Sequence, residues 1–358
     1  MYFTHPQFKN FSLKPFFKKF SEADLKNKLN IFFPQRHIVF TDYGRSAFQI
    51  AVQELKLENS EILIPAYICD IFSPILKHYN IKPIYLDIDL KTFNINASEI
   101  EQKITPQTKS ILICHTYGLP VEMDKILEIA EKHNLKIIED CAHMFPSTIY
   151  GDYTFFSLPK FLPSVNGGIL ISKKPINYSL SDYKFTLGNI IKFARLFPIL
   201  AKISELFRTQ SKGNQGEIKG ESRGNPRKAS KLSLKIFNWY LDNFEEQISK
   251  RTELAKYFQE KLRKIGFEVQ KSENNTFIYI SALVPESLNR DELFKKLRKK
   301  GIFCSRIWQK PIISDKQRFP NTYESSKRII NFPLQNWFSQ KDVDEIINDI
   351  LSALNSIS

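Results

Sequence analysis

Short, continuously apolar segments alternate with helical patterns along the first half of this chain. Strand-like runs occupy residues 61–65, 82–87, 110–115 and 135–139, with helical patterns between them at 68–78, 97–103 and 123–133. Strands that are apolar on both faces are typical of a parallel sheet covered by helices on either side. The alternation therefore predicts an α/β fold, a three-layer α/β/α arrangement around a mainly parallel sheet.

Polar residues gather where these strands end. Tyr67, His115, Asp140 and His143 each follow an apolar run. Ligands of open α/β sheets bind beyond the carboxyl ends of the strands, so we expect these side chains to meet in one site. The alternative for the two histidines is an ordinary hydrogen-bonded histidine at a strand end, and Tyr67 could simply be core.

Further along the chain, one lysine is surrounded by apolar residues. Lys160 lies among Phe156, Leu158, Phe161 and Leu162, between strand patterns at 155–157 and 168–172. Desolvation lowers the pKa of a lysine and makes its amine a nucleophile at neutral pH, so we expect a lowered pKa here.

A lysine for a Schiff base, together with a carboxylate such as Asp140 for a pyridinium nitrogen, is what pyridoxal phosphate (PLP) requires of a protein. The alternatives are a surface lysine beside a proline bend and an aspartate that caps a turn.

An anion-binding pattern comes earlier in the chain. A short strand pattern at 37–40 leads through Asp42, Gly44 and Ser46 into an apolar helix at 47–55. Backbone N–H groups at a helix N-terminus can hold a phosphate. A glycine turn with an N-cap serine is the common alternative.

The chain changes character after residue 178. Between residues 184 and 235 it has 12 Lys or Arg and 3 Glu, which indicates a basic insertion at about 184–229. We consider three roles for this insertion, in this order: a solvated surface segment, a lid over an anionic ligand, and a patch that docks weakly on anionic lipid.

We expect three parts. An N-terminal segment (1–36) packs on the small or the large domain. A large PLP-binding domain covers 37–240, and a long helix at 230–265 leads into a smaller α+β domain at 241–358, with strands at 277–283 and 302–307 and helices at 289–300 and 340–355.

Composition and charge limit the partners and the cellular location that we expect. The net charge of +14 fits phosphorylated ligands, and no nucleic-acid-binding motif accompanies it, so we expect no nucleic acid partner. The cysteines at 69, 114, 141 and 304 form no CxxC pair, which predicts neither a metal site nor disulfides. No apolar run reaches the roughly 18 residues of a membrane-spanning helix. A cytoplasmic protein is expected.

Five blocks of sequence carry a family resemblance: residues 81–89, 94–96, 104–111, 115–124 and 137–143. In this order and spacing they resemble the DegT/DnrJ/EryC1/StrS family of PLP-dependent sugar aminotransferases. The likeness runs from about Phe40 to the C-terminus. It implies the fold-type I architecture of aspartate aminotransferase and PLP as cofactor.

The resemblance also implies roles. Lys160 matches the Schiff-base lysine and later acid–base group, and Asp140 the partner of the pyridine nitrogen. His143 stands near the cofactor's 3-oxygen, where glutamine is usual. The remaining implied cofactor contacts are the phosphate-binding residues Gly44, Arg45, Ser46 and Ser157, and Tyr67 or Cys69 over the ring face.

His115 and Tyr117 would line the same cavity, and Arg306 and Trp308 would reach the substrate from the small domain. A strand carrying a packed tryptophan is the equal alternative for the last two. The short spacing between Ser157 and Lys160 departs from the usual family pattern.

The expected activity is transfer of an amino group, from glutamate or another amino acid, to a nucleotide-linked keto-sugar in surface polysaccharide or amino-sugar biosynthesis. A homodimer is expected by family likeness. The alternatives are another PLP reaction on this fold, and a degenerate homologue that binds or scaffolds in glycan assembly. The sugar, the carbon that is aminated and the donor stay open.

Overall fold

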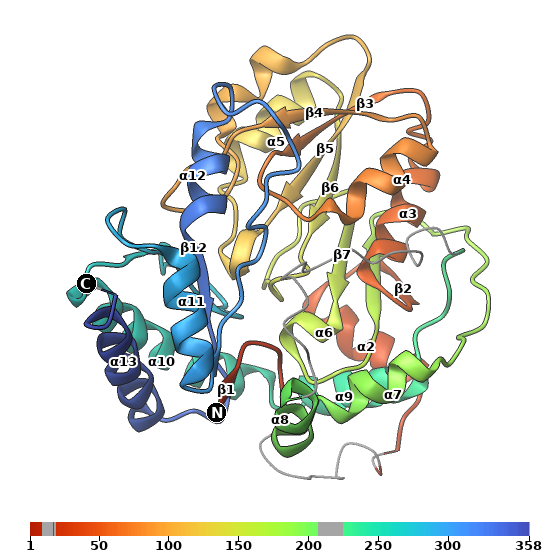
Figure 1. Cartoon of the computed structure of the whole chain (residues 1–358). Coiled ribbons are helices and arrows are strands. Elements are labelled where there is room, and N and C mark those ends of the chain that lie inside the picture. Colours follow the sequence, from red (N-terminus) through yellow and green to blue (C-terminus); the bar gives the residue numbers. More distant parts are fainter. Residues whose placement is uncertain (9–16, 18, 207–224, 358) are drawn as a thin grey trace.

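The computed structural model describes residues 1–8, 17, 19–206 and 225–357 (Figure 1). Its centre is a seven-stranded sheet with the strand order β2-β8-β7-β6-β5-β3-β4. Only β8 runs against its neighbours, so the expected mainly parallel sheet is confirmed. Its strands are β2 (His37–Thr41), β3 (Glu61–Pro65), β4 (Lys82–Leu86), β5 (Thr108–Cys114), β6 (Lys136–Asp140), β7 (Tyr153–Ser157) and β8 (Gly168–Ser172).

Helices cover both faces of this sheet (Figure 1). Because successive strand side chains point to opposite faces, Ile62 and Ile64 of β3 pack with α3 and α4, while Leu63 packs with α5 on the other face. β2 and β8 pack against α2 and α9. These helices are α2 (Glu22–Phe32), α3 (Gly44–Glu54), α4 (Ser73–His78), α5 (Asp124–Lys132) and α9 (Lys231–Leu241).

A smaller three-stranded antiparallel sheet has the order β12-β10-β9. Its apolar side chains share one core with the helices α10, α11 and α13. The strands are β9 (Glu268–Val269), β10 (Ile280–Leu283) and β12 (Ile329–Phe332), and the helices are α10 (Phe244–Lys264), α11 (Arg290–Lys299), α12 (Pro320–Arg328) and α13 (Gln340–Leu354).

The described part of the N-terminal segment contacts both sheets. β1 (Tyr2–Phe3) pairs in parallel with β11 (Ile302–Phe303) on the small-sheet side. Further along, Lys28 of α2 bonds Asp242 at 2.5 Å, and Phe33 packs on Phe145 under the large sheet. The segment thus connects two parts of the chain that are far apart in sequence. The domain boundaries at residues 36 and 240 remain our proposal.

Several expected elements are shorter or divided. The predicted helix at 230–265 is wrong as one element: α9 ends at Leu241 and α10 starts at Phe244, after the Asn243 cap. Ser230 caps α9 by accepting from the Ser233 N–H. The predicted helix at 97–103 is two 3₁₀ turns, η2 (Ala97–Glu99) and η3 (Glu101–Lys103), capped by Asn96. α12 and β12 were not predicted.

The basic segment contributes two helices where it is described, α7 (Leu187–Ala194) and α8 (Pro198–Leu206). The described residues also form three short helical turns: η1 (Asp70–Phe72), η4 (Thr116–Gly118) and α6 (Leu158–Phe161). Residues 207–224 of the predicted insertion lie outside the described residues.

Two adjacent glycines bring the turn after β2 against the loop before β8. The Gly167 N–H donates to the Asp42 carbonyl at 2.6 Å, and the Leu158 N–H donates to the Gly167 carbonyl at 2.9 Å. A Cβ on Gly168 would stand 2.5 Å from the backbone of Tyr43. Only glycine permits this approach, which places the N-terminus of α3 next to the lysine loop.

We expect Gly168→Ala to destabilise the protein by about 1–3 kcal/mol or more, because the added methyl group forces the Tyr43 backbone away. Gly188→Ala is the matched control. Gly188 is exposed in α7, its added Cβ meets only the Thr186 Oγ1 at 3.7 Å, and alanine favours helix by up to about 1 kcal/mol. Denaturant unfolding followed by circular dichroism measures both; equal stability of the two variants would contradict the expectation.

Candidate active site

The carboxyl ends of β2, β5, β6 and β7 meet at one edge of the large sheet. Backbone hydrogen bonds continue past the strands there: the His115 N–H donates to the Asp140 carbonyl at 3.2 Å, and the Cys141 N–H donates to the Phe155 carbonyl at 2.9 Å. The lysine turn α6 follows β7 directly. Residues that are more than 100 positions apart in sequence therefore border one site.

Lys160 and His143 lie in direct contact. The Lys160 Nζ is 3.1 Å from the His143 Nε2, and the Tyr117 N–H donates to the His143 Nδ1 at 3.3 Å. Burial and the charge of Lys160 hold the pKa of His143 well below its ordinary value, so the imidazole is neutral. A neutral ring has a single N–H. Because Nδ1 accepts, Nε2 carries the proton, and it can donate to the Lys160 Nζ only when that amine is uncharged.

The predicted lowering of the Lys160 pKa is wrong, because the pKa is raised. Burial by itself lowers it, but Tyr279, Cys69, Asp140 and Cys114 outweigh burial and raise it. Burial raises the pKa of the Tyr279 phenol and of the Cys114 thiol, so both are protonated at neutral pH, and the Asp140 carboxylate is an anion that favours protonated Lys160. The raised pKa keeps Lys160 protonated at neutral pH in the cofactor-free protein, so the uncharged amine, which is the form that attacks a carbonyl, requires the loss of a proton.

Asp140 is buried at the end of β6. Burial raises the pKa of its carboxyl to about 6, against the opposing effects of the Ala142 N–H and the nearby charges. The Ala142 N–H donates to its Oδ1 at 2.8 Å. A carboxyl in this state ionises readily once a cation is placed beside it.

The N-terminus of α3 forms one end of the site. Gly44 starts this helix, and Tyr43 at the N-cap position makes no side-chain cap. A Cβ on Gly44 would lie 3.1 Å from the Phe156 carbonyl and 3.3 Å from the Ser157 Cβ. Gly44 and Ser157 are therefore neighbours, while the Ser46 side chain hydrogen-bonds the Asp42 carboxyl. Arg45 lies over the Tyr43 ring, 4.2 Å from its centroid.

An aromatic group closes the other side. The rings of Tyr117, His143 and Trp308 stack pairwise with centroids 5.5–5.8 Å apart. The Tyr67 and Tyr117 hydroxyls are 2.8 Å apart, and the Ile307 carbonyl lies 3.3 Å from the first and 3.1 Å from the second. Because each phenol has one proton, one donates to the other hydroxyl and the second donates to the carbonyl. Tertiary folding thus brings Trp308, from beyond β11, onto residues at the ends of β3, β5 and β6.

Other predicted residues are placed differently. His115 uses both ring nitrogens within the fold: its Nδ1 accepts from the Val121 N–H at 3.0 Å, and its Nε2 lies 3.3 Å from Glu139. Arg306 donates to Asp291 at 2.7 Å and stacks on Phe294. This geometry favours structural roles for His115 and Arg306.

Sequence reasoning missed Tyr279. This buried tyrosine precedes β10, its ring meets the His143 ring edge-on at 6.2 Å, and its phenol is electrostatically coupled to Lys160. Among the described residues, no group hydrogen-bonds its hydroxyl. The alternation of Phe277 and Tyr279 in that strand pattern was the available signal, but strand alternation does not specify which sheet end a residue approaches.

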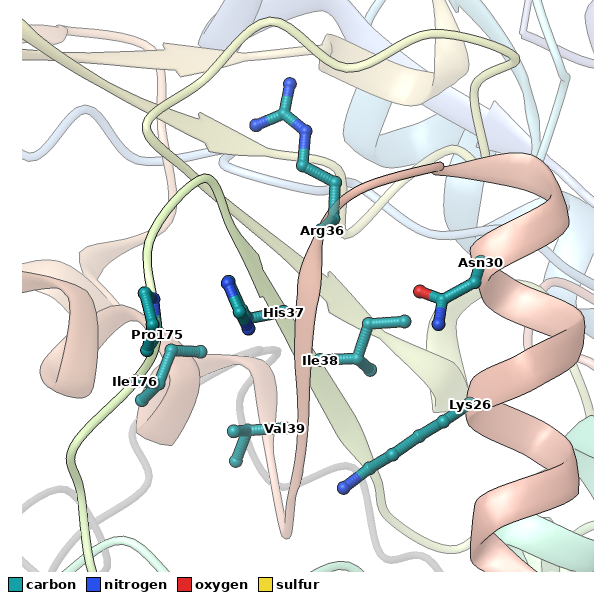
Figure 2. Close-up of a pocket in the computed structure, with 8 residues that line it drawn as sticks. All are labelled: Lys26, Asn30, Arg36, His37, Ile38, Val39, Pro175 and Ile176. Carbon is teal, nitrogen blue, oxygen red and sulfur yellow. The ribbon is translucent and has the colours of Figure 1, made fainter.

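A separate hollow of about 410 Å³ lies at the open edge of β2, between α2 and residues 175–176 (Figure 2). Its cations serve the fold: Arg36 points away from the hollow and donates to the Ile149 and Gly151 carbonyls at 3.2 Å, and Lys26 pairs with Glu22. It holds none of the residues described above, so we do not consider it the catalytic site.

The strand-end site fits PLP in four respects. It has an amine at Lys160, a buried carboxyl at Asp140, a helix N-terminus at Gly44, and the aromatic faces of His143 and Trp308. These supply what a phosphate, a pyridine ring and an aldehyde need from a protein.

Comparison with known proteins identifies an aminotransferase family. The model of the DegT/DnrJ/EryC1/StrS aminotransferase family matches residues 18–176 and 197–351. GDP-perosamine synthase of Escherichia coli O157:H7 is 36% identical over 140 residues, 37% of this chain and 38% of that protein. The dTDP-4-amino-4,6-dideoxy-D-glucose transaminase of Escherichia coli is 26% identical over 326 residues, 89% of this chain and 82% of that one.

The solved structure of NtdA from Bacillus subtilis, with bound cofactor PMP, has a TM-score of 0.70 at 20% identity and covers 96% of this chain and 80% of that chain. At this identity it shows that the fold is shared.

The raised pKa of Asp140 has a consequence for the cofactor-free protein. The folded carboxyl, with a pKa of about 6, holds its proton more tightly than an unfolded aspartate near 3.9, so this contribution to stability is present below about pH 4 and lost as the pH rises through 6. We expect Asp140→Asn to be more stable than wild type at pH 8, by about 1–3 kcal/mol, and to lose that advantage near pH 4.

Denaturant unfolding at the two pH values measures the difference, with exposed Glu122→Gln as the control. A difference between Asp140→Asn and wild type that is the same at pH 4 and pH 8 would show that the carboxyl is not desolvated.

Proposed function

Because this chain belongs to the DegT/DnrJ/EryC1/StrS aminotransferase family, we propose that it is a PLP-dependent aminotransferase that transfers an amino group from an amino acid to a nucleotide-linked keto-sugar. The observation that carries the proposal is the contact of the Lys160 amine with neutral His143, beside the buried carboxyl of Asp140. A sugar substrate agrees with the names of the relatives.

PLP supplies an aldehyde for the amine and a ring that accepts electrons from the bond being broken. Lys160 is placed to bind that aldehyde and afterwards to move a proton at its Nζ. Ionised Asp140 would hold a proton on the ring nitrogen of PLP. Once Lys160 is uncharged, the Nε2–H of His143 would orient its amine, and Tyr117 fixes the ring of His143 through its backbone N–H.

The phosphate of PLP would lie at the N-terminus of α3, against Ser157. The separation of Ser157 from Lys160 is short because α6 is a single turn, Leu158–Phe161, that starts immediately after the strand. The amine still reaches His143 at 3.1 Å. The departure from the usual spacing therefore leaves the lysine in the site.

Two alternative functions can be distinguished from the proposed aminotransferase. Another PLP reaction on this fold is supported by His143, whose hydrogen bond to the catalytic amine could change which proton is moved. A binding or scaffold protein of glycan assembly would need no working amine. The enclosed contact between Lys160 and His143 favours an enzyme over the second alternative.

We also propose glutamate as the donor, a role in surface polysaccharide or amino-sugar biosynthesis, a homodimer, and a cytoplasmic location. Support for the anionic substrate comes from the net charge of +14 and from the exposed cations of the basic segment. Within the described ranges, no helix combines the length and apolar character needed to cross a membrane.

We expect borohydride reduction of the PLP-loaded protein to fix the cofactor on Lys160, with the modified peptide identified by mass spectrometry. Lys160→Ala should carry no label, because no other amine is held against Asp140 in the described site. Exposed Lys173→Ala is the control and should label as wild type does. A colourless protein that takes up no PLP would refute every enzyme hypothesis considered above.

We expect the PLP-loaded protein to convert L-glutamate to 2-oxoglutarate, one equivalent per active site, in a single half-reaction without any sugar. Replacing Lys160 by alanine removes the acid–base group, so the rate should fall by at least about 100-fold. Quantifying 2-oxoglutarate after rapid mixing measures this. If no amino donor supports the half-reaction although PLP is bound, another PLP reaction is the better assignment.

A further inference from the structure

One arginine of the helix α10 is buried without a counter-ion. Arg251 is 5% exposed, and its Nε donates to the Asn336 Oδ1 at 2.6 Å. Among the described residues, no carboxylate pairs with its guanidinium, and its terminal nitrogens find no acceptor. Burial lowers the pKa of this guanidinium, but an arginine keeps its proton in proteins, so a positive charge stays in the interior.

Buried arginines are almost always paired, because the removal of a charge from water is costly. The two other arginines that the described part of the chain buries to a similar degree follow this rule. Arg290 pairs with Asp291, and Arg328 pairs with three glutamates. Arg251 therefore differs from them in lacking an anion, and not in its degree of burial.

Arg251 borders a small cavity that the chain encloses between α9, α10 and the residues after His143. The cavity measures about 10 Å³, and its lining is mainly aromatic and aliphatic, with Phe145, Phe161 and Phe244 as the rings of phenylalanine. No lining residue carries a negative charge. This volume holds about one water molecule or one monatomic ion. It is too small for a phosphate group or for a carboxylate side chain inserted by a second copy of the chain.

A second polar donor borders the same cavity. Tyr240 is 2% exposed, and its printed contacts are with the rings of Phe161 and Phe244; within the described ranges its hydroxyl has no hydrogen bond. Arg251 is electrostatically coupled to this phenol. A buried tyrosine hydroxyl usually finds a partner. Two buried donors without acceptors, one of them a cation, therefore meet at a cavity that has room for a single small ligand.

We propose that this cavity binds a small monatomic anion, chloride, held by the guanidinium of Arg251 and the hydroxyl of Tyr240. A water molecule would accept from both donors, but it would leave the charge of Arg251 uncompensated among apolar side chains. An anion supplies both the acceptor and the opposite charge. Guanidinium is weakly hydrated, which suits it to an ion pair in the interior.

The anion would connect α10 to the segments that carry the site. Phe161 directly follows Lys160, and Met144 and Phe145 directly follow His143, and all three line the cavity. The bound ion would thus hold the helix that leads into the small sheet against the back of the lysine turn. This anion site is separate from the proposed place of PLP, and the inference does not depend on the proposed reaction.

The first test compares the full-length, PLP-loaded protein in sodium chloride and in sodium gluconate at equal ionic strength, so that screening is the same. We expect the melting temperature to rise with chloride and then level off, by about 2 °C or more, because chloride binds only the folded state. Arg251→Met should lose this dependence. Arg263→Met, an exposed arginine of the same helix, is the control and should keep it.

The second test removes one hydroxyl. In Tyr240→Phe we expect the chloride concentration at the midpoint of the rise to increase by about tenfold or more, because a hydrogen bond to a charged group is lost. Tyr257→Phe is the control: its hydroxyl donates to Asp344 at 2.8 Å, away from the cavity, so the midpoint should not change. Circular dichroism and borohydride labelling of Lys160 verify that each variant is folded.

Crystals soaked in sodium bromide locate the ion, because bromide replaces chloride and scatters anomalously. We expect a peak within hydrogen-bond distance of Arg251 and Tyr240 in the wild type, and none there in Arg251→Met. Equal melting temperatures in chloride and gluconate overturn the proposal and indicate that the cavity holds water. An unchanged chloride dependence in Arg251→Met, or bromide peaks only at surface cations, also overturns it, and an unchanged midpoint in Tyr240→Phe contradicts the placement at Tyr240.

Discussion

The close backbone contact between the turn after β2 and the loop before β8 is the constraint on which the site depends. Two hydrogen bonds through Gly167 join Asp42, on the phosphate side, to Leu158, on the lysine side. Gly168 leaves no room for a side chain against Tyr43. Because these contacts are between backbone atoms, they fix the separation of the helix N-terminus from the lysine turn within narrow limits. A cofactor with a phosphate at one end and an aldehyde at the other requires such a fixed separation.

Next to this backbone contact the fold buries ionisable side chains, whose burial costs stability. Asp140, His143 and Lys160 are held together in an aromatic setting, where desolvation raises the carboxyl pKa to about 6 and keeps the imidazole neutral. Buried ionisable groups cost stability unless they are paired or bound. Their concentration at the carboxyl edge of the sheet is the physical reason to place the chemistry there, and the hollow at the β2 edge shows by contrast that cations and volume alone do not define a site.

Much of the site could be predicted because it follows strand periodicity. Asp140 and Ser157 end apolar strands, and Gly44 begins a helix after a strand, so a parallel sheet brings them to one edge. Tyr279 and the inward position of Trp308 could not be predicted in this way, because both come from the part around the small sheet and reach the site through packing. His115 illustrates the reverse case: its position at a strand end was read correctly, yet Glu139 and Val121 take up both nitrogens.

By itself, the sequence determined the layered α/β fold and the set of groups that PLP requires, since apolar periodicity and residue chemistry are local properties of the chain. Only the tertiary structure decided the state of those groups. The neutral imidazole of His143, the raised pKa of Lys160 and the aromatic stack beside them depend on burial and on neighbours from distant segments, which no local pattern records. The same holds for Arg251: the sequence places it in a charged helix, but only the tertiary packing buries it beside Tyr240 with no carboxylate partner among the described residues.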